Sequence, residues 1–404
     1  MEKLYLTPQR VQELNGGFSA AFGRQPLRYF SAPGRTEISG NHTDHQRGRV
    51  LAGAVNLDTV AAVRENDLGI IRVQSQGYPL CRIDLDFLQP VPEEVGTTAS
   101  LIRGVAARFR ELGYAIGGFD AYITSQVLSG SGLSSSAAFE VLMGGILSCL
   151  FNDGAVSAPQ LAMIGQHAEN VFFGKPCGLM DQTACAVGGM VTIDFAEKEN
   201  PVIREVDFDF ASCGHALCII DTQASHADLT DEYAAIPGEL KAICRHFGCE
   251  VLRQVPEAAF YAQIPALRES CGDRAVMRAI HFFEENSRVG QQVQALETGK
   301  FDIFLAMQTQ SGFSSWTQLQ NVIPAGNVQK QEMAVALGLC RHLLGHRGAY
   351  RVHGGGFAGT VQAFVPLDML EPFRAEMDRV LGNGACHVLS IREQGFTEAF
   401  PEQS

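Results

Sequence analysis

The fold is decided by the stretch Gly130-Ser131-Gly132-Leu133-Ser134-Ser135-Ser136-Ala137-Ala138-Phe139-Glu140-Val141. It follows an alternating segment, 119–127, and runs into an apolar segment, 137–151, so the pattern predicts a strand, a loop and a helix. Glycines let a backbone approach an anion closely, and serines provide hydroxyl groups and helix caps. A helix that begins here directs its unpaired N–H groups and positive dipole end at the loop. The stretch therefore predicts a phosphate-binding loop, although a flexible connection has the same composition.

This loop differs from the common P-loop, because the Lys-[Ser/Thr] pair that ends that motif is absent. We therefore expect backbone amides, hydroxyl groups and a metal ion to hold the nucleotide. Positive charge has to come from another part of the chain.

Composition and charge limit the partners of the chain. With 404 residues, 46% of them hydrophobic, it predicts a globular protein of two or three domains. The formal net charge of −13 argues against nucleic-acid and membrane partners, so a basic residue that faces an anionic ligand is a local exception. The sequence predicts no particular oligomeric state.

The cysteines and the N-terminal segment predict a cytoplasmic protein. The eleven cysteines are dispersed and form no C-x-x-C pair, which is typical of reduced structural thiols rather than of disulfides or a zinc site. Residues 1–10 lack a basic-then-apolar leader, and the most apolar predicted helix, 137–151, is too short to span a bilayer.

A second polar loop is Pro33-Gly34-Arg35-Thr36-Glu37-Ile38-Ser39-Gly40-Asn41-His42-Thr43-Asp44-His45-Gln46-Arg47-Gly48. Glycines bracket it, and its Arg, Asn, His and Asp side chains suit a polyhydroxylated ligand, since every sugar hydroxyl needs a donor or an acceptor. A solvated hairpin loop fits the same pattern. The β-favouring runs around it predict a sheet, with strands at 28–31, 35–39, 50–55 and 59–64.

Two later segments carry candidate chemistry. Cys177-Gly178-Leu179-Met180-Asp181-Gln182 places one carboxylate near the start of a predicted helix, where Asp181 is either a functional group or a helix cap. Gly354-Gly355-Gly356-Phe357-Ala358-Gly359 joins two predicted strands, either as a tight hairpin or as a turn against phosphates. His342 and His346 are four residues apart on a predicted helix, but no acidic residue completes a metal site, so we interpret them as ordinary histidines.

In this order, the loops 33–48 and 130–141 and the turn 354–359 resemble the signature set of the GHMP small-molecule kinases, and most closely that of the galactokinases. The segments 168–182 and 278–289 are similar to galactokinase segments as well. The resemblance implies an α+β fold with two domains and the active site between them. Residues 1–210 would form a sugar- and nucleotide-binding domain that resembles ribosomal protein S5 domain 2, and residues 211–404 a ferredoxin-like domain.

The resemblance also implies an activity, the ATP- and Mg²⁺-dependent phosphorylation of galactose at its anomeric hydroxyl. Asp181 is then the base or the orienting acceptor for that hydroxyl, and Arg35 favours the ionised Asp181 and offsets phosphoryl charge. Ser135 or Ser136 holds Mg²⁺ together with Glu169. The implied phosphate contacts are Gly130, Ser131, Gly132, Leu133, Ser134, Ser135 and Ser136, and the implied sugar contacts are Asn41, His42, Asp44, Gly178, Asp181 and Tyr233.

The sequence departs from the galactokinase pattern in the second polar loop, residues 33–48, which we call the sugar loop. Galactokinases usually read Gly-Glu-His-Thr-Asp-Tyr-Asn there, and Asn41, His45 and Gln46 replace the Glu, the Tyr and the Asn of that pattern. The family's Glu contacts the sugar near its C6 hydroxyl, so we predict that Asn41 widens or shifts the tolerance at C6. The family's tryptophan before the predicted helix 100–113 is also missing, which leaves the nucleotide preference open.

Two alternatives remain beside the galactose kinase. One is a sugar 1-kinase for a C6- or C2-modified hexose, such as a uronic acid or an N-acetylhexosamine. The other is a non-catalytic sugar sensor on the same fold. The presence of Arg35, Glu169 and Asp181 weighs against the sensor, because a protein that only binds sugar does not need that set.

Overall fold

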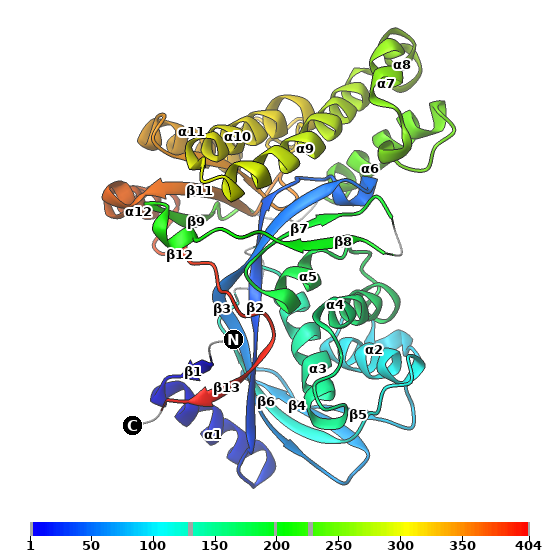
Figure 1. Cartoon of the computed structure of the whole chain (residues 1–404), viewed down its shortest axis with the longest axis vertical. Coiled ribbons are helices and arrows are strands. Elements are labelled where there is room, and N and C mark those ends of the chain that lie inside the picture. The colour runs from blue at the N-terminus through cyan, green and yellow to red at the C-terminus, as the bar shows by residue number, and fades with distance from the viewer. Residues whose placement is uncertain (1–2, 128–131, 198–199, 225–228, 403–404) are drawn as a thin grey trace.

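The computed structural model describes residues 3–127, 132–197, 200–224 and 229–402, in which the strands form two sheets (Figure 1). The strands of the larger sheet are β1 (Leu4–Leu6), β2 (Arg28–Ser39), β3 (Arg49–Glu65), β4 (Ile70–Ser75), β5 (Cys81–Asp84), β6 (Phe119–Ser125), β7 (Met190–Asp194), β8 (Val202–Glu205) and β13 (Thr397–Pro401). Their order is β1-β13-β2-β3-β6-β4-β5, and β7 joins by pairing with β3 and β8.

The strands β2 and β3 are longer than the sequence predicts. Separate strands at 28–31 and 35–39 were expected because Pro33 and Gly34 interrupt the β pattern, and this prediction was wrong. The pairing of β2 with β3 shifts register between Pro33 and Arg35. A proline has no N–H group to donate, and a bulge tolerates it because the hydrogen-bond ladder is already interrupted there. One continuous strand therefore runs from Arg28 to Ser39 and includes the first part of the predicted polar loop.

Helices cover both faces of the larger sheet (Figure 1). The helix α1 (Pro8–Phe22) packs against β6 and β3 on one face. On the other lie α2 (Thr98–Glu111), α3 (Ser135–Phe151), α4 (Ala158–His167) and α5 (Met180–Val187), with a π-helical turn, Ala168–Phe173, after α4. α3 is buried over most of its surface because its residues are apolar on nearly all sides. Its start is consequently fixed relative to the sheet.

The smaller sheet is antiparallel and has the order β10-β11-β9-β12, with β9 (His215–Asp221), β10 (Ala349–His353), β11 (Thr360–Pro366) and β12 (Cys386–Leu389). The helices of this part are α6 (Thr230–His246), α7 (Glu257–Ala262), α8 (Ile264–Cys271), α9 (Asp273–Glu297), α10 (Phe301–Ser314), α11 (Glu332–Leu344) and α12 (Leu370–Leu381), and a π-helical turn, Ser315–Leu319, follows α10. Because α11 ends at Leu344, His346 is not on the helix of His342, contrary to the prediction.

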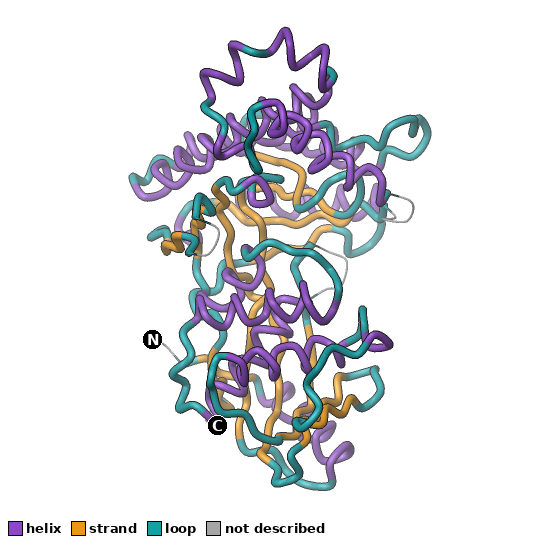
Figure 2. Tube along the Cα trace, turned by 90° about the vertical axis from the view of Figure 1, so that its right-hand side faces the viewer, coloured by secondary structure: helices purple, strands orange, loops and turns teal. Residues whose placement is uncertain are grey.

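The end of the chain returns to the larger sheet, where β13 pairs with β1 and β2. The first and last strands of the described chain, β1 and β13, therefore lie side by side (Figure 1). Figure 2 shows the strands running along the molecule towards the helices at its top. Sheets with helices packed on them, and without regular alternation of strand and helix, make the α+β fold that the sequence predicts.

No helix in the described ranges is both long and apolar enough to cross a membrane.

Candidate active site

The first two motifs meet where β2 passes the start of α3. The backbone N–H of Arg35 donates to the carbonyl oxygen of Leu133 at 3.1 Å, and the Arg35 guanidinium donates to the carbonyl oxygen of Gly132. A Cβ atom on Gly34 would lie 3.0 Å from the same Leu133 oxygen, so a glycine suits this close approach. Gly130 and Ser131, which the sequence also assigns to the phosphates, lie outside the described residues.

Asp181 lies in the first turn of α5 and forms a bidentate ion pair with Arg35. Its two carboxylate oxygens accept hydrogen bonds from Nε and Nη2 of Arg35, both at 2.8 Å, and Oδ2 also accepts from Ser134 Oγ. Burial alone would raise the pKa of Asp181, but the charge and hydrogen bonds of Arg35, followed by Ser134, lower it below its ordinary value. The N-cap of α5 is Leu179, so Asp181 is not the helix cap. It is an ionised acceptor.

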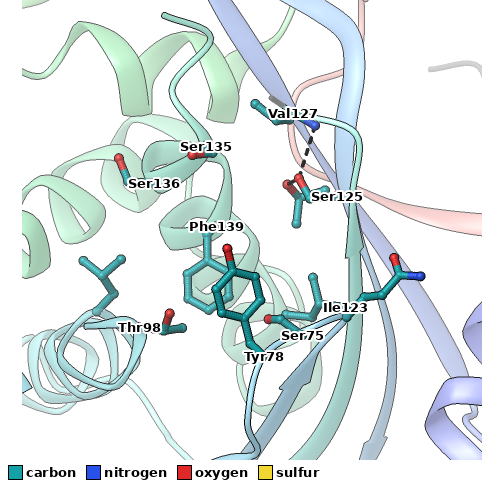
Figure 3. Close-up of a pocket in the computed structure, with 12 residues that line it drawn as sticks. Ser75, Tyr78, Thr98, Ile123, Ser125, Val127, Ser135, Ser136 and Phe139 are labelled. Carbon is teal, nitrogen blue, oxygen red and sulfur yellow. Dashed lines mark hydrogen bonds between the residues drawn. The ribbon is translucent and has the colours of Figure 1, made fainter. Parts of the chain in front are cut away.

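The start of α3 borders a cavity of about 330 Å³. Ser135 and Ser136 line one part of it, and the rings of Tyr78 and Phe139 lie in its middle (Figure 3). The unpaired N–H groups of the first helical turn make this end of α3 electropositive. The other lining residues are Thr59, Ser75, Gln76, Thr98, Leu101, Ile123, Ser125 and Val127. Aromatic faces beside an electropositive helix start suit a ligand that joins a flat base to phosphates.

Glu169 lies in the π-helical turn after α4 and is only 2% exposed. Its Oε1 accepts hydrogen bonds from Ser136 Oγ and Lys175 Nζ, both at 3.1 Å, and its Oε2 accepts from Gln182 Nε2 at 2.9 Å. A carboxylate and a hydroxyl thus lie together beside the start of α3. Such oxygen atoms are the ligands that hard divalent cations prefer.

Glu140, which lies one turn after Ser136 in α3, is a second buried carboxyl group. Its Oε2 accepts from Gln182 Nε2 at 2.9 Å, while its Oε1 has no hydrogen-bond partner among the described residues. Burial, and then the charge of Glu169, raise the pKa of Glu140 well above its ordinary value. Gln182 therefore joins the two carboxyl groups.

Asp44 and Gly178 are brought together on the sugar side. A Cβ atom on Gly178 would lie 2.5 Å from Oδ2 of Asp44, so a side chain at this position would collide with the carboxyl group. Burial raises the pKa of Asp44, and the charge of Asp181 adds to that effect, whereas a hydrogen bond from the His45 backbone and the charge of His42 oppose it. Asp44 thus lies close enough to Asp181 for their charges to interact.

The glycine turn 354–359 is held by three side chains at three successive carbonyl oxygens. Asn41 Nδ2 donates to Gly354 O at 2.6 Å, His42 Nε2 lies 2.9 Å from Gly355 O, and Tyr233 Oη donates to Gly356 O at 2.7 Å. The turn consequently lies against the sugar loop. Backbone groups of Thr222 and Asn321 contact the turn as well, and the choice between a tight hairpin and a turn against phosphates stays a prediction.

The structure corrects the role predicted for Asn41. Its side chain is 1% exposed, and Nδ2 also lies 3.2 Å from Glu37 Oε1. Its Oδ1 accepts from Asn321 Nδ2 at 2.9 Å and from Ser315 Oγ at 3.3 Å. Each polar atom of Asn41 thus has protein partners, and the side chain has no free donor or acceptor for a sugar hydroxyl. The structure therefore contradicts a direct contact between the Asn41 amide and the C6 group, and an effect of Asn41 on the tolerance at C6 stays a prediction.

Sequence reasoning missed five residues of this site, namely Lys175, Gln182, Glu140, Tyr78 and Phe139. Four of them lie in or beside segments that the sequence singled out, but their residue types suggest no role without a known partner. Tyr78 gave no signal at all, because it lies in a turn between β4 and β5, far in sequence from the loop that it faces. Only the folded chain brings it to α3.

Comparisons with known proteins identify the family to which the chain is similar. Residues 17–65 match the galactokinase galactose-binding signature, and residues 100–189 match the N-terminal domain of the GHMP kinases. A galactokinase of Streptomyces coelicolor is 32% identical over 357 residues, which cover 86% of this chain and 87% of that protein.

Solved structures show the same fold. The galactokinase of Lactococcus lactis, complexed with galactose, superposes with a TM-score of 0.80 at 24% identity, over 96% of this chain and 99% of its own. A mevalonate kinase superposes with a TM-score of 0.65 at 14% identity, over 91% of this chain and 100% of its own. The fold predicted from the three motifs is therefore confirmed.

Proposed function

Since the chain belongs to the galactokinase family, we propose that it transfers the γ-phosphoryl group of ATP to the anomeric hydroxyl of galactose and so forms galactose 1-phosphate. The observation that carries this proposal is the Arg35–Asp181 ion pair, which lies between the start of α3 and the sugar loop. Phosphoryl transfer needs alignment and charge stabilisation more than a protein nucleophile, and this pair is suited to both tasks.

Asp181 orients the anomeric hydroxyl by accepting its hydrogen bond. The lowered pKa of Asp181 makes it a weak base, so it takes up the proton only as the bond to phosphorus forms. Arg35 keeps Asp181 ionised and offsets the negative charge on the phosphoryl group. Asp44 and Gly178 are assigned to the sugar because they contact each other beside Asp181. Tyr233, which bonds to the glycine turn, is assigned to the sugar on the family resemblance alone.

ATP lies in the cavity beside α3, with its phosphates at the helix start and its base near Tyr78 and Phe139. The electropositive end of α3, the backbone of 132–134 and the hydroxyl of Ser135 support the phosphate assignment. Tyr78 and Phe139 are the aromatic side chains of this cavity, and they replace the missing family tryptophan as stacking partners.

The residues present also fit Mg²⁺. Glu169 and Ser136 would hold it, and the unpartnered Oε1 of Glu140 shows that the surrounding oxygens are not all used by the protein. When bound, the ion neutralises charge on the β- and γ-phosphates. Lys175, already paired with Glu169, supplies the positive charge that the P-loop lysine supplies elsewhere.

Galactose is favoured over a C6-modified sugar by the position of Asn41. The argument for a uronic acid depended on an Asn41 amide that faces C6, and this amide is occupied by Gly354, Glu37, Asn321 and Ser315. Without a contact between the Asn41 amide and the sugar, none of the described residues gives a reason to expect a carboxylate at C6.

The test is a substrate panel in which ADP release is measured with galactose, glucose, galacturonate, glucuronate and N-acetylgalactosamine, each with ATP and with GTP. We expect the highest kcat/KM with galactose and ATP. A higher kcat/KM with an acidic or N-acetylated sugar would overturn the choice of substrate, and no turnover with any sugar would favour the sensor.

The metal assignment has its own test. Glu169→Gln removes one charge from the proposed Mg²⁺ ligands and leaves the sugar loop intact, so we expect the Mg²⁺ midpoint at fixed ATP to rise about tenfold or more. The galactose KM should change much less. Glu371→Gln, at an exposed position of α12, is the matched control. An unchanged midpoint would remove Glu169 from the metal site.

We further propose that the two units divide near residue 210, with the last strand, β13, belonging to the first unit. The pairing of β13 with β2 supports the assignment of this last strand to the first unit, although β13 lies after residue 210 in the chain.

A cytoplasmic location is supported by the eleven free cysteines, because cytosolic thiols stay reduced.

A further inference from the structure

A second cavity, of about 290 Å³, lies between α10, α11 and β10. The helices α10 and α11 lie in the upper part of the molecule, away from α3 (Figure 1). The lining residues are Thr309, Gly312, Phe313, Trp316, Thr317, Leu337, Gly338, Arg341 and Tyr350. None of them belongs to the proposed phosphoryl-transfer site, and two of them, Trp316 and Thr317, lie in the π-helical turn Ser315–Leu319.

Two aromatic rings of this cavity are exposed to solvent. Phe313 is 62% exposed and Trp316 is 40% exposed, and the half-buried ring of Tyr350 borders the same space. Large aromatic side chains that stay in water forgo much of the free energy that their burial would contribute. A flat apolar ligand would cover them.

Gly338 enlarges the cavity at a position where the helix does not need a glycine. It lies in the interior of α11, where glycine destabilises a helix by roughly 0.5–1 kcal/mol relative to alanine. A Cβ atom at this position would meet no described atom within 4 Å. Packing within the protein therefore gives no reason for the missing side chain, whereas a ligand in the cavity would.

Arg341 places a free positive charge at this cavity. Its side chain forms no ion pair and no hydrogen bond with any residue in 3–127, 132–197, 200–224 or 229–402, although the chain carries a formal net charge of −13. A guanidinium group in this position suits a carboxylate, which it can bind with two parallel hydrogen bonds.

We propose that this cavity binds a small aromatic carboxylate, with the ring on Phe313 and Trp316 and the carboxylate on Arg341. The site is separate from the sugar and nucleotide sites, and the proposal does not depend on the phosphoryl-transfer reaction. A ligand of this size that gains a buried ring and one charge-assisted contact has a Kd on the order of 1 mM.

Tryptophan fluorescence tests the proposal directly, because Trp316 is the only tryptophan in the chain. We expect phenylacetate to change the fluorescence saturably, and phenylacetamide, its neutral analogue, to bind about tenfold more weakly. Arg341→Gln should weaken phenylacetate binding by a similar factor and leave phenylacetamide binding unchanged. Saturating galactose and ATP should not displace phenylacetate.

Gly338→Leu fills the cavity and should abolish the response. Its control is Gly16→Leu, at an exposed glycine of α1 where a Cβ atom likewise meets nothing within 4 Å. The proposal is overturned by the absence of a saturable response at about ten times the expected Kd. It is equally overturned by equal phenylacetate binding to the parent and Arg341→Gln, by displacement with galactose and ATP, or by an unchanged response in Gly338→Leu.

Discussion

The sugar side and the nucleotide side of the site are built in opposite ways. On the sugar side, residues 36–41 are bonded to the second part of the chain by buried groups. Arg351 Nη2 pairs with Glu37 Oε1 at 2.6 Å, Gln362 Nε2 donates to Thr36 Oγ1 at 2.8 Å, and His281 Nε2 lies 2.9 Å from the Asn41 carbonyl oxygen. We call this network the seam. On the nucleotide side, Tyr78 is 65% exposed, and Thr98 is exposed as well.

This difference indicates how each ligand is selected. The hydrogen bonds of the seam are buried, although Arg351 Nε and Gln362 Oε1 have no partner among the described residues. A buried network of this kind favours one arrangement, so we expect the seam to hold the sugar loop in a fixed geometry before the sugar binds. Exposed side chains that touch little can adjust to the base. We therefore expect substitutions in the seam to change stability and sugar specificity, and substitutions around Tyr78 to change only the affinity for nucleotide.

The largest effect is expected at Asp181, where the two sides meet. Asp181→Ala removes the acceptor for the anomeric hydroxyl, so kcat should fall by roughly 10²–10⁴-fold, the range for a lost proton-transfer group. Galactose affinity, measured by calorimetry, should stay largely intact. Asp302→Ala, exposed in the first turn of α10, is the control. Near-normal turnover would remove Asp181 from the mechanism.

The second prediction concerns Asn41 in the seam. Asn41→Asp replaces a donor by an oxygen that faces Gly354 O and the Glu37 carboxyl group, so the free energy of unfolding should fall by about 2–4 kcal/mol. Urea unfolding measures it, with the exposed Asn200→Asp as control. A loss no larger than that of the control would mean that the seam is adaptable.

The same geometry predicts the outcome of Asn41→Glu, which restores the Glu of the galactokinase pattern. The longer carboxylate would lie beside Glu37 in a buried network, so we expect lower stability and lower kcat/KM.

Glu285 gives the seam a pH dependence. Its Oε1 accepts from Ser311 Oγ at 2.7 Å and from the Gly40 N–H at 3.2 Å. Burial alone would raise its pKa, but the charges of Arg288 and His281, among others, lower it from 4.5 to about 2. A carboxyl group with a lowered folded-state pKa stabilises the fold fully above pH 4.5, and this contribution is lost as the pH falls towards 2.

Glu285→Gln should therefore reduce the free energy of unfolding on the order of 2–3 kcal/mol near neutral pH. The difference from the parent should shrink at about pH 3.5, because the parent has by then lost part of the contribution. Urea titrations at both pH values measure the difference, with Glu371→Gln as control. A difference that stays the same at both values contradicts the lowered pKa of Glu285.

The smallest effect is expected on the nucleotide side. Tyr78→Ser removes a stacking surface worth about 1–2 kcal/mol, so the KM for ATP should rise about fivefold to thirtyfold while the KM for galactose stays within about twofold. Tyr78→Phe keeps the ring and should behave as the parent. An unchanged KM for ATP in Tyr78→Ser would show that Tyr78 does not stack on the base.

Much of the candidate site could be predicted from the sequence because its residues lie in local motifs. The loop before α3, the carboxylate at the start of α5 and the polar loop after β2 each depend on residues that are neighbours in the chain, and turn and helix-start chemistry is local. The sequence wrongly predicted a break in β2, because Pro33 and Gly34 usually end a strand. Here they are tolerated at a bulge, and the position of the bulge depends on the partner strand.

The sequence by itself determined the fold class, the family and the three motifs. Only the tertiary structure decided which side chains face the ligands and which are used to hold the fold. Asn41 shows why: its residue type suits a sugar, but Gly354, Ser315 and Asn321, all more than 270 positions away in the chain, reach its polar atoms first. Hydrogen-bond partners at such separations are set by the packing of whole elements, and no local pattern encodes that packing.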